Sequence, residues 1–270
     1  MSLAVRRYDR EERFLTDYGP WAVVTGASDG IGRAIARELA RKGFGLVLVA
    51  RGEAMLKEVA ADLSRLSGIE TRVVPADLGS DAGIAAVDAA TSQLDVGLLV
   101  AAAGFGTSGP FLSSDVATEL DMIAVNCRAV ASLSHSFGRR FVARGRGGIV
   151  LLSSLVAFQG VPRAANYSAT KAYVQSLAEG LAVELKPRGV DVLASAPGPV
   201  RSGFDKRAGM TLGMAQTPEE VAAATLGALG RRVTVRPGFL AKGLEAALAP
   251  LPRWGRVRIM TRVMAGMTGG

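Results

Sequence analysis

The chain has 270 residues, of which 49% are hydrophobic and 6% aromatic, which argues against disorder and is enough to bury a large core of Ala, Val and Leu. Cys127 is the only cysteine, which excludes an intramolecular disulfide and favours a reducing compartment, so we expect a cytoplasmic location. We expect no signal peptide, because the first eighteen residues are charged and have no apolar core, and no membrane span, because no run approaches about 18 apolar residues.

The net charge of +8 is concentrated near the C-terminus. From residue 231 onward there are eight Lys or Arg residues and one acid, Glu245, which leaves a net charge of +7. Such a segment could attract an acidic lipid surface or a phosphate-bearing substrate, or it could be a solvated face with no partner. Nucleic-acid binding is not expected, because no recognition motif accompanies the charge.

Apolar strands alternate with helical patterns through most of the chain, which predicts an α/β fold with a parallel sheet covered by helices on both faces. The expected strands are 21–25, 46–50, 71–75, 96–102, 149–153 and 191–196. The expected helices are one with Ile31, Ile35 and Leu39 on one face, then 53–67, 120–143 and 165–185. No linker or repeat divides this pattern, so we expect a single domain.

The regular pattern lapses after Pro197 and resumes at Thr217, which is followed by Pro218 and Glu220. These three residues predict a helix start with a capping box and a proline in the first turn. The irregular segment before it, about 203–217, is predicted to be a substrate lid, and a surface loop without a role is the alternative.

The last segment, 236–270, is predicted to be a basic, partly apolar extension. If residues 254–267 are helical, Arg258 and Arg262 fall on one side and Met260 falls on the other with the neighbouring apolar residues. This helix could touch a membrane surface, or it could pack on the domain or on a partner subunit.

A glycine-rich segment, TGASDGIG at residues 25–32, lies between the first strand and the first helix. Glycines in such a turn let the backbone approach a pyrophosphate, and the helix N-terminus stabilises its charge. The segment therefore predicts a dinucleotide site, with simple strand-to-helix packing as the alternative.

Arg51 directly follows the second strand. Dinucleotide-binding folds place an acid there to bind the ribose hydroxyls of NAD, or a basic residue to accept the 2′-phosphate of NADP. A guanidinium can bind that phosphate with two hydrogen bonds, so Arg51 favours NADP(H) over NAD(H). An exposed arginine without a ligand is the alternative.

Tyr167 and Lys171 are four residues apart on a predicted helix and therefore share one face. A nearby ammonium favours the phenolate, so we expect Lys171 to lower the pKa of Tyr167. Ser154, thirteen residues before the tyrosine, could donate a hydrogen bond to a carbonyl oxygen while Tyr167 transfers the proton. Without Ser154, the pair alone would be ordinary helix surface. Ser153 is expected to be structural.

The segments TGASDGIG and YSATK (167–171) resemble the two main signatures of the short-chain dehydrogenase/reductase family, with similarity from residue 19 to about 203. The resemblance implies a Rossmann-type doubly wound parallel sheet over 19–235, preceded by a charged lead-in of residues 1–18. It also implies hydride transfer between NADP(H) and a carbonyl or alcohol carbon, catalysed by Ser154, Tyr167 and Lys171.

By the same resemblance, Asn126 would support a water-linked proton relay through its backbone carbonyl and Lys171. Asp77 would contact the adenine, and Val200 and Ser202 would bind the nicotinamide carboxamide. The residues that the resemblance assigns to the cofactor are Gly26, Ser28, Asp29, Gly30, Ile31, Arg51, Asp77, Leu78, Ala103, Gly104, Tyr167, Lys171, Pro197, Gly198, Val200 and Ser202. No metal site is expected.

One segment departs from the family pattern. The family's usual Asn-Asn-Ala-Gly appears here as Ala101-Ala102-Ala103-Gly104, which removes two amide side chains that normally brace the central sheet. We therefore expect the sheet to be braced differently at this point, with backbone contacts to the cofactor kept at Ala103 and Gly104.

Further similarity lies in the opening YGPWAVVTGASDGIG, the segment LVLVAR and the C-terminal stretch. These resemble the branch of 3-oxoacyl-thioester reductases and 17β-hydroxysteroid dehydrogenases, which implies a lipid-like, 3-oxoacyl or steroid-like ketone. The family also implies a homodimer or homotetramer assembled through the helices that carry Asn126 and Tyr167. A non-catalytic NADP-binding regulator and a membrane-peripheral scaffold that uses the basic tail remain alternatives.

Overall fold

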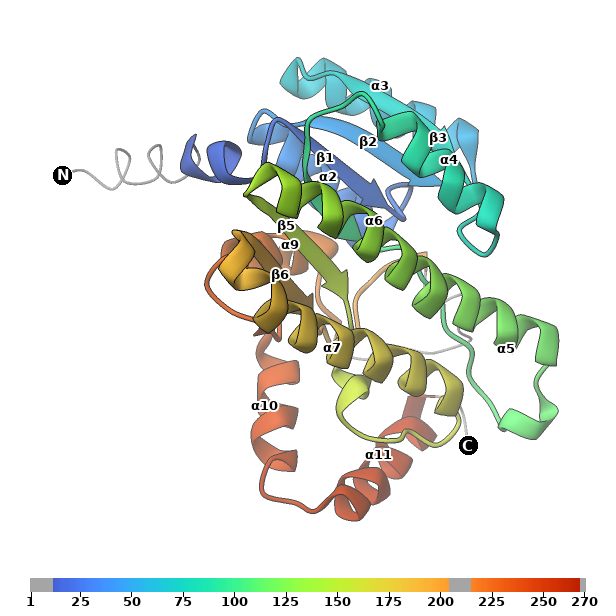
Figure 1. Ribbon diagram of the computed structural model, residues 1–270. Coiled ribbons are helices and arrows are strands. Elements are labelled where there is room, and N and C mark those ends of the chain that lie inside the picture. The colour runs from blue at the N-terminus through green and yellow to red at the C-terminus, as the bar shows by residue number, and fades with distance from the viewer. Residues whose placement is uncertain (1–11, 204–214, 268–270) are drawn as a thin grey trace.

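The computed structural model describes residues 12–203 and 215–267. Within them, seven parallel strands form one sheet in the order β3-β2-β1-β4-β5-β6-β7 (Figure 1). The strands are β1 (Trp21–Thr25), β2 (Gly45–Ala50), β3 (Thr71–Pro75), β4 (Val96–Ala101), β5 (Gly147–Leu152), β6 (Val190–Ser195) and β7 (Thr234–Val235). The order reverses between β1 and β4, and ligands of such sheets bind at this reversal, beside the carboxyl ends of the strands.

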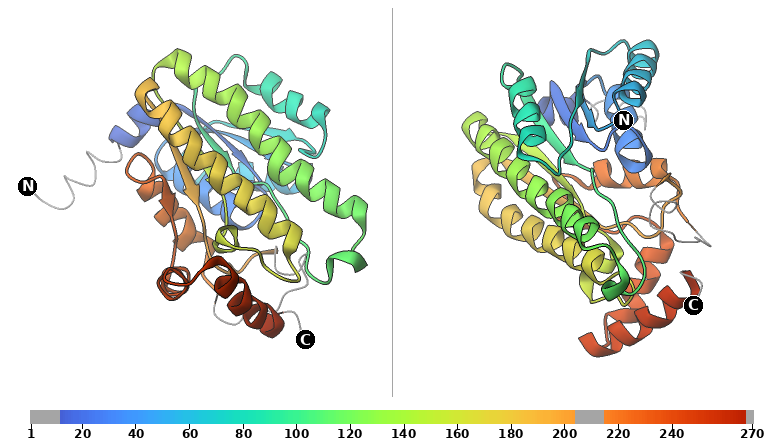
Figure 2. Two further views of the ribbon diagram at one scale, coloured as in Figure 1. Left: turned by 60° about the horizontal axis from the view of Figure 1, so that its bottom comes forward. Right: turned by 90° about the vertical axis from the view of Figure 1, so that its right-hand side faces the viewer.

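Helices cover both faces of the sheet, as expected for a doubly wound fold (Figure 2). One face is covered by α2 (Gly30–Arg41), α3 (Glu53–Ser67) and α9 (Pro218–Ala228). The other face is covered by α4 (Asp81–Thr91), α6 (Ala129–Arg144) and α7 (Ala165–Leu185). The predicted Rossmann-type architecture is therefore confirmed.

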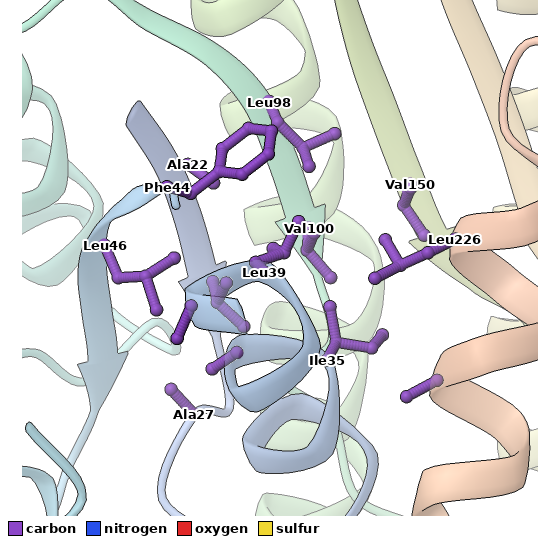
Figure 3. Packing of buried hydrophobic residues seen from close by; sticks show 14 of the residues in the cluster. Ala22, Ala27, Ile35, Leu39, Phe44, Leu46, Leu98, Val100, Val150 and Leu226 are labelled. Carbon is purple, nitrogen blue, oxygen red and sulfur yellow. The ribbon is translucent and has the colours of Figure 1, made fainter. Parts of the chain in front are cut away.

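The strands are apolar along their whole length because both of their faces are buried. Successive residues of a strand point to opposite faces, so Val24 joins the core under α2 and Val23 joins the core under α6. Ile35 and Leu39, which lie one turn apart on α2, fill the first core between the strands (Figure 3). This packing fixes the ends of the strands relative to the helices that follow them.

Most of the expected boundaries hold. The helices at 53–67 and 165–185 and the strands at 21–25 and 71–75 have the bounds predicted from the sequence. Thr217 caps α9, and the capping box with Glu220 is formed. The strand expected at 149–153 instead spans Gly147–Leu152. Glycine is required at its first two positions, because a Cβ there would stand 2.6 Å from Phe141 and 2.9 Å from Tyr18.

The helix expected at 120–143 is three elements. These are α5 (Val116–Ile123), a π-helical turn η2 (Ala124–Arg128) and α6. Helix α4 was not predicted, and neither was β7, which has two residues. The short 3₁₀ helices η1 (Phe111–Ser113), η3 (Leu155–Phe158) and η4 (Lys186–Arg188) complete the connections.

The two ends of the chain pack onto the domain. Residues 12–18 of the lead-in are helical, and the Tyr18 hydroxyl donates a 2.6 Å hydrogen bond to Asp191 on β6. At the other end, α10 (Phe239–Leu248) and α11 (Arg253–Met267) lie beyond the carboxyl ends of the strands (Figures 1 and 2). Met260 of α11 is 1% exposed and packs with Val161 and Ala164, so this face of the extension packs on the domain.

The predicted lid falls mostly on residues 204–214, which lie outside the described residues. The chain on either side is paired, since Gln216 donates its N–H to Pro199 and accepts the N–H of Arg201. None of the helices in the described part of the chain combines the length and apolarity needed to cross a bilayer.

Candidate active site

A cavity of about 620 Å³ opens at the carboxyl ends of the strands, where the loops after β1 to β6 converge. All the catalytic and cofactor residues expected from the sequence line this cavity except Asn126, which is buried behind its wall. The structure therefore brings together residues from six separate loops and from helix α7. This juxtaposition defines the candidate active site.

The glycine-rich turn has the geometry that a pyrophosphate needs. Gly26 and Gly30 have positive φ angles of 66° and 56°, which favour glycine. A Cβ on Gly26 would lie 2.9 Å from the Ala103 nitrogen, and one on Gly32 would lie 2.3 Å from the Gly26 oxygen. These two glycines therefore let the turn pack closely against the loop after β4 and against itself, and α2 begins at the cavity with its positive end towards it.

Asp29 has a structural task within this turn. One carboxylate oxygen accepts the N–H of Gly30 at 2.7 Å, and the other accepts the N–H of Gly203 at 3.0 Å. Asp29 thus caps α2 and ties the glycine turn to the loop after β6. It lines the cavity, and its carboxylate already serves two backbone donors.

The adenosine end of the cavity is lined by Arg51 and Asp77. Arg51 is exposed and directly follows β2, and Asp77 follows β3 and accepts the N–H of Gly79 at 3.0 Å. The nearby Leu78 is 4% exposed and provides an apolar floor. A guanidinium at this rim fits a ribose phosphate, so the residues present fit a phosphorylated dinucleotide.

The three catalytic candidates meet at the other end of the cavity. Ser154 follows β5, and Tyr167 and Lys171 lie on the first turns of α7. Ser154 is hydrogen-bonded to Tyr167, and the Lys171 ammonium lies 5.8 Å from the centre of the Tyr167 ring. Ser153 instead donates to the Lys171 carbonyl at 3.2 Å, which agrees with the structural role expected for it.

Burial decides the protonation of this group. It raises the pKa of Tyr167 to about 12, and the hydrogen bond from Ser154 opposes this rise only in part. It also lowers the pKa of Lys171 to about 8. The net shift of the Tyr167 pKa is therefore opposite to the expected lowering, because burial outweighs the groups that favour the phenolate, and the Lys171 ammonium donates to the Leu152 carbonyl at 2.7 Å. The phenol keeps its proton at neutral pH and can donate it.

Asn126 lies in the π-helical turn and is 1% exposed. Its side-chain nitrogen donates to the Phe105 carbonyl at 2.9 Å and to Thr170 Oγ1 at 3.0 Å, and its oxygen accepts the Phe105 N–H at 3.1 Å. π-helical turns are rare and often mark functional sites. Here the turn places a buried amide between the loop after β4 and α7, where it braces both.

Hydrogen bonds from Thr25 and Asn126 brace the sheet at the point where the family's two asparagines are absent. The Ala103 N–H donates to Thr25 Oγ1 at 3.0 Å, which joins the loop after β4 to the end of β1. Asn126 holds the same loop at Phe105. Side chains from outside the loop thus supply the missing hydrogen bonds, and the backbone at Ala103 and Gly104 still lines the cavity.

The catalytic end of the cavity has an apolar wall that sequence reasoning missed. Its members come from η3, from the turn before α7, and from the C-terminal helices, and they are Leu155, Val156, Ala164, Leu244 and Met260. The sequence marks Met260 only as part of an apolar helix face, and it does not mark Leu244. Within the described residues, no cluster of three or more His, Cys, Asp or Glu could hold a metal ion.

Comparison with known proteins agrees with this geometry. Residues 20–212 match the family model described as short chain dehydrogenase, and the chain belongs to the short-chain dehydrogenase/reductase family. It is therefore an oxidoreductase that acts on CH–OH or C=O groups.

Two relatives in sequence are informative. A 7beta-hydroxysteroid dehydrogenase from Clostridium sardiniense is 35% identical over 185 residues, which cover 68% of this chain and 71% of the relative. A very-long-chain 3-oxoacyl-CoA reductase-B from Danio rerio is 36% identical over 226 residues, covering 82% of this chain and 72% of the relative.

Two solved structures share the fold. A short-chain dehydrogenase from Sphingobium yanoikuyae in complex with NADPH has a TM-score of 0.77 and 33% identity, covering 86% of this chain and 94% of the other. A 7beta-hydroxysteroid dehydrogenase structure has a TM-score of 0.85 and 28% identity, covering 92% and 98% of the two chains.

Proposed function

We propose that this protein is an NADP(H)-dependent reductase of bulky, apolar ketones and that Ser154, Tyr167 and Lys171 carry the reaction. One observation carries the proposal: a half-buried, protonated phenol, hydrogen-bonded to a serine, lies at the apolar end of a cavity whose other end is a glycine turn. The cofactor and the ketone can therefore meet beside Tyr167.

The choice of NADP(H) rests on Arg51. Its guanidinium stands at the rim of the cavity, where a carboxylate would repel a 2′-phosphate. The glycine turn would hold the pyrophosphate, Asp77 and Leu78 the adenine, and Pro197, Gly198, Val200 and Ser202 the nicotinamide end. The Sphingobium yanoikuyae neighbour in complex with NADPH supports this assignment.

When bound, reduced nicotinamide supplies a hydride to the carbonyl carbon. Ser154 donates a hydrogen bond to the carbonyl oxygen and orients it. Tyr167 gives that oxygen its phenolic proton, so the ketone becomes an alcohol and the tyrosine becomes a phenolate. Lys171 stabilises the phenolate by its charge. A proton relay from solvent through the backbone carbonyl of Asn126 and Lys171 then returns the proton to Tyr167.

The substrate class follows from the wall of the catalytic end. Leu155, Ala164, Leu244 and Met260 offer this region a continuous apolar surface. Such a surface fits a ketone carried on a large hydrocarbon body, a description that covers both a steroid and a long 3-oxoacyl chain. The two relatives' names, a 7beta-hydroxysteroid dehydrogenase and a very-long-chain 3-oxoacyl-CoA reductase, support this class.

The proposal includes a cytoplasmic homodimer or homotetramer. The oligomer is supported by apolar side chains that are exposed on α5 and α7. Val116 and Leu120 of α5 are 66% and 60% exposed, and Val183 of α7 is 74% exposed. A membrane-peripheral scaffold is less well supported, because Met260 of the basic extension is turned into the protein, although Trp254 on the same helix is 71% exposed.

Cofactor titration followed by a ketone panel tests the function. We expect the protein to bind NADPH in preference to NADH and to reduce 3-oxoacyl thioesters or ketosteroids. Tyr167→Phe should lower turnover on the order of 10²- to 10⁴-fold while leaving NADPH binding intact. Tyr173→Phe, an exposed tyrosine on the same helix, is the matched control. NADPH binding with no turnover of any ketone would favour the non-catalytic regulator instead.

A further inference from the structure

Two buried polar cross-links join the same three segments of the protein. The first is Asn126, which bridges Phe105 to Thr170. The second is Glu119 of α5, which is 5% exposed. The Thr107 hydroxyl donates to its Oε1 at 2.8 Å, and the Asn166 side-chain nitrogen donates to its Oε2 at 2.7 Å and to its backbone oxygen at 2.9 Å.

The two cross-links have matching positions in the fold. On α7, Asn166 and Thr170 are one helical turn apart. Each of them directly precedes a catalytic candidate, since Asn166 is followed by Tyr167 and Thr170 by Lys171. The cross-link from Asn126 therefore ends beside the lysine, and the cross-link from Glu119 ends beside the tyrosine.

Burying the carboxyl group of Glu119 costs free energy, which indicates that its hydrogen bonds are needed to hold its partners in place. A buried carboxylate loses its hydration, and an apolar side chain would fill the same space without that loss. Among the ion pairs formed by the described residues, none includes Glu119. Its two carboxyl oxygens accept directional hydrogen bonds from Thr107 and Asn166. Such bonds fix the orientation of both partners.

We propose that Glu119 is a positioning residue for Tyr167. Through Asn166 it holds the first turn of α7, which carries the phenol. Through Thr107 it holds the loop that carries Gly104 and Phe105, both of which line the cavity. Glu119 thus sets the tyrosine relative to the bound reactants without touching them. This proposal rests on the proposed ketone reduction.

The test compares Glu119→Ala with Glu119→Gln in the full chain. Alanine removes both hydrogen-bond acceptors of the side chain, and we expect kcat per NADPH-binding site to fall on the order of 10- to 100-fold, with KM and NADPH affinity little changed. Glutamine can accept from Asn166 and donate to the Thr107 hydroxyl, so it should restore most of the lost kcat. Glu184→Ala, an exposed glutamate on α7, is the matched control.

A double-mutant cycle adds a second criterion. Because Glu119 is expected to act through Asn166, combining Glu119→Ala with Asn166→Ala should cost little more than either change alone. A merely structural role would reduce the number of NADPH-binding sites and leave kcat per site unchanged. Unchanged kcat per site in Glu119→Ala, or fully additive losses in the double variant, would overturn the proposal.

Amide hydrogen exchange tests the same idea without turnover. Residues 103–110 and 162–171 should exchange faster in Glu119→Ala than in the unmodified protein, and Glu119→Gln should restore slow exchange. Equal exchange in all three proteins would overturn the positioning role whatever the substrate is. If the unmodified protein reduces no ketone but exchange responds as expected, the proposed function fails and the cross-link stands. If Tyr167→Phe abolishes turnover while Glu119→Ala changes nothing, only the positioning role fails.

Discussion

Gly104 lies so close to Asn126 that a Cβ on the glycine would stand 2.9 Å from the asparagine Oδ1. The same Cβ would lie 3.5 Å from Lys171 Nζ. Asn126 cannot move aside easily, because its amide is held by Phe105 and Thr170. The positions of Lys171 and Asn126 therefore require a glycine, which has no side chain, at position 104 in the loop after β4.

Gly104→Ala should damage the site. We expect a loss of stability of about 1–3 kcal/mol from overpacking and a fall in kcat/KM, because Asn126 or Lys171 must shift. The control is Gly180→Ala on α7, where an added Cβ meets no atom within 4 Å and should be neutral or stabilising by up to about 1 kcal/mol. Denaturant unfolding and steady-state kinetics measure both effects. Equal behaviour of the two variants would contradict the expected crowding.

Arg51→Asp should exchange the cofactor preference. Losing a charged hydrogen-bonding partner costs about 1.5–3 kcal/mol, so NADPH affinity should fall on the order of 10- to 100-fold while NADH affinity is kept or improved. Fluorescence titration with both cofactors measures this. Arg139→Asp, an exposed arginine of α6 away from the cavity, controls for the change in net charge. Retained NADPH preference in Arg51→Asp would show that the 2′-phosphate binds elsewhere.

Ketone reduction should decline as the pH rises through about 8. This is the pKa to which burial lowers Lys171, so the ammonium is present below that pH and is lost above it. A neutral lysine no longer stabilises the phenolate that Tyr167 becomes when it gives up its proton. Tyr167 itself, with a pKa of about 12, remains protonated over this range. The pH profile of kcat/KM for reduction measures the decline, and a flat profile from pH 7 to 10 would contradict it.

The lowered pKa of Lys171 should also make the free energy of unfolding depend on pH. Between about pH 8 and the ordinary lysine value of 10.5, unfolded chains hold a proton on Lys171 that folded chains do not, so this residue makes the free energy of unfolding rise with pH. The raised pKa of Tyr167 acts in the opposite direction only above its ordinary value of 10. Burial also raises the pKa of Cys127 above its ordinary value of 9.0, which acts in the opposite direction within the range from pH 7.5 to 9.5. Comparing denaturant unfolding of the unmodified protein with that of Lys171→Met over this range isolates the lysine, whose contribution to the slope should be lost in the variant.

Leu244→Trp should narrow the range of substrates. The side chain is partly buried and lines the apolar wall of the catalytic end. A larger ring there should raise KM for a ketosteroid or a long 3-oxoacyl thioester on the order of tenfold or more, since excluding a few methylene-sized groups costs 1–3 kcal/mol each. A small ketone should be little affected. Leu66→Trp, at a 54% exposed site on α3, is the control, and equal losses for large and small ketones would contradict this assignment of the wall.

Much of the fold could be predicted because local patterns and tertiary demands agree. The strands are apolar on both faces because both faces are buried. The start of α9 is predicted by Thr217, Pro218 and Glu220, which form its capping box and first turn. Helix α4 could not be predicted from the sequence pattern, because it is rich in alanine and only Ile84, Val87 and a few small residues face the core. Its polar and apolar positions differ too little to mark a face.

The chemistry was predictable only in part. Ser154, Tyr167 and Lys171 stand at a recognisable spacing, but the burial that raises the pKa of Tyr167 comes from residues far along the chain. Glu119 looks like an ordinary helix glutamate, and its contacts to Thr107 and Asn166 appear only when α5 packs on α7. The π-helical turn around Asn126 likewise depends on packing on both sides. Interactions of this kind have no local signal.

The ketone wall of the cavity is built from two separate parts of the sequence. Of the described residues that line the cavity, all precede position 203 except Leu244 and Met260, which belong to the C-terminal extension. A recombination event at the junction after β7 would therefore keep the dinucleotide cradle and the proton donor intact and replace two members of the ketone wall. Exchange of this extension alone would therefore change the range of ketones that fit without changing the cofactor site.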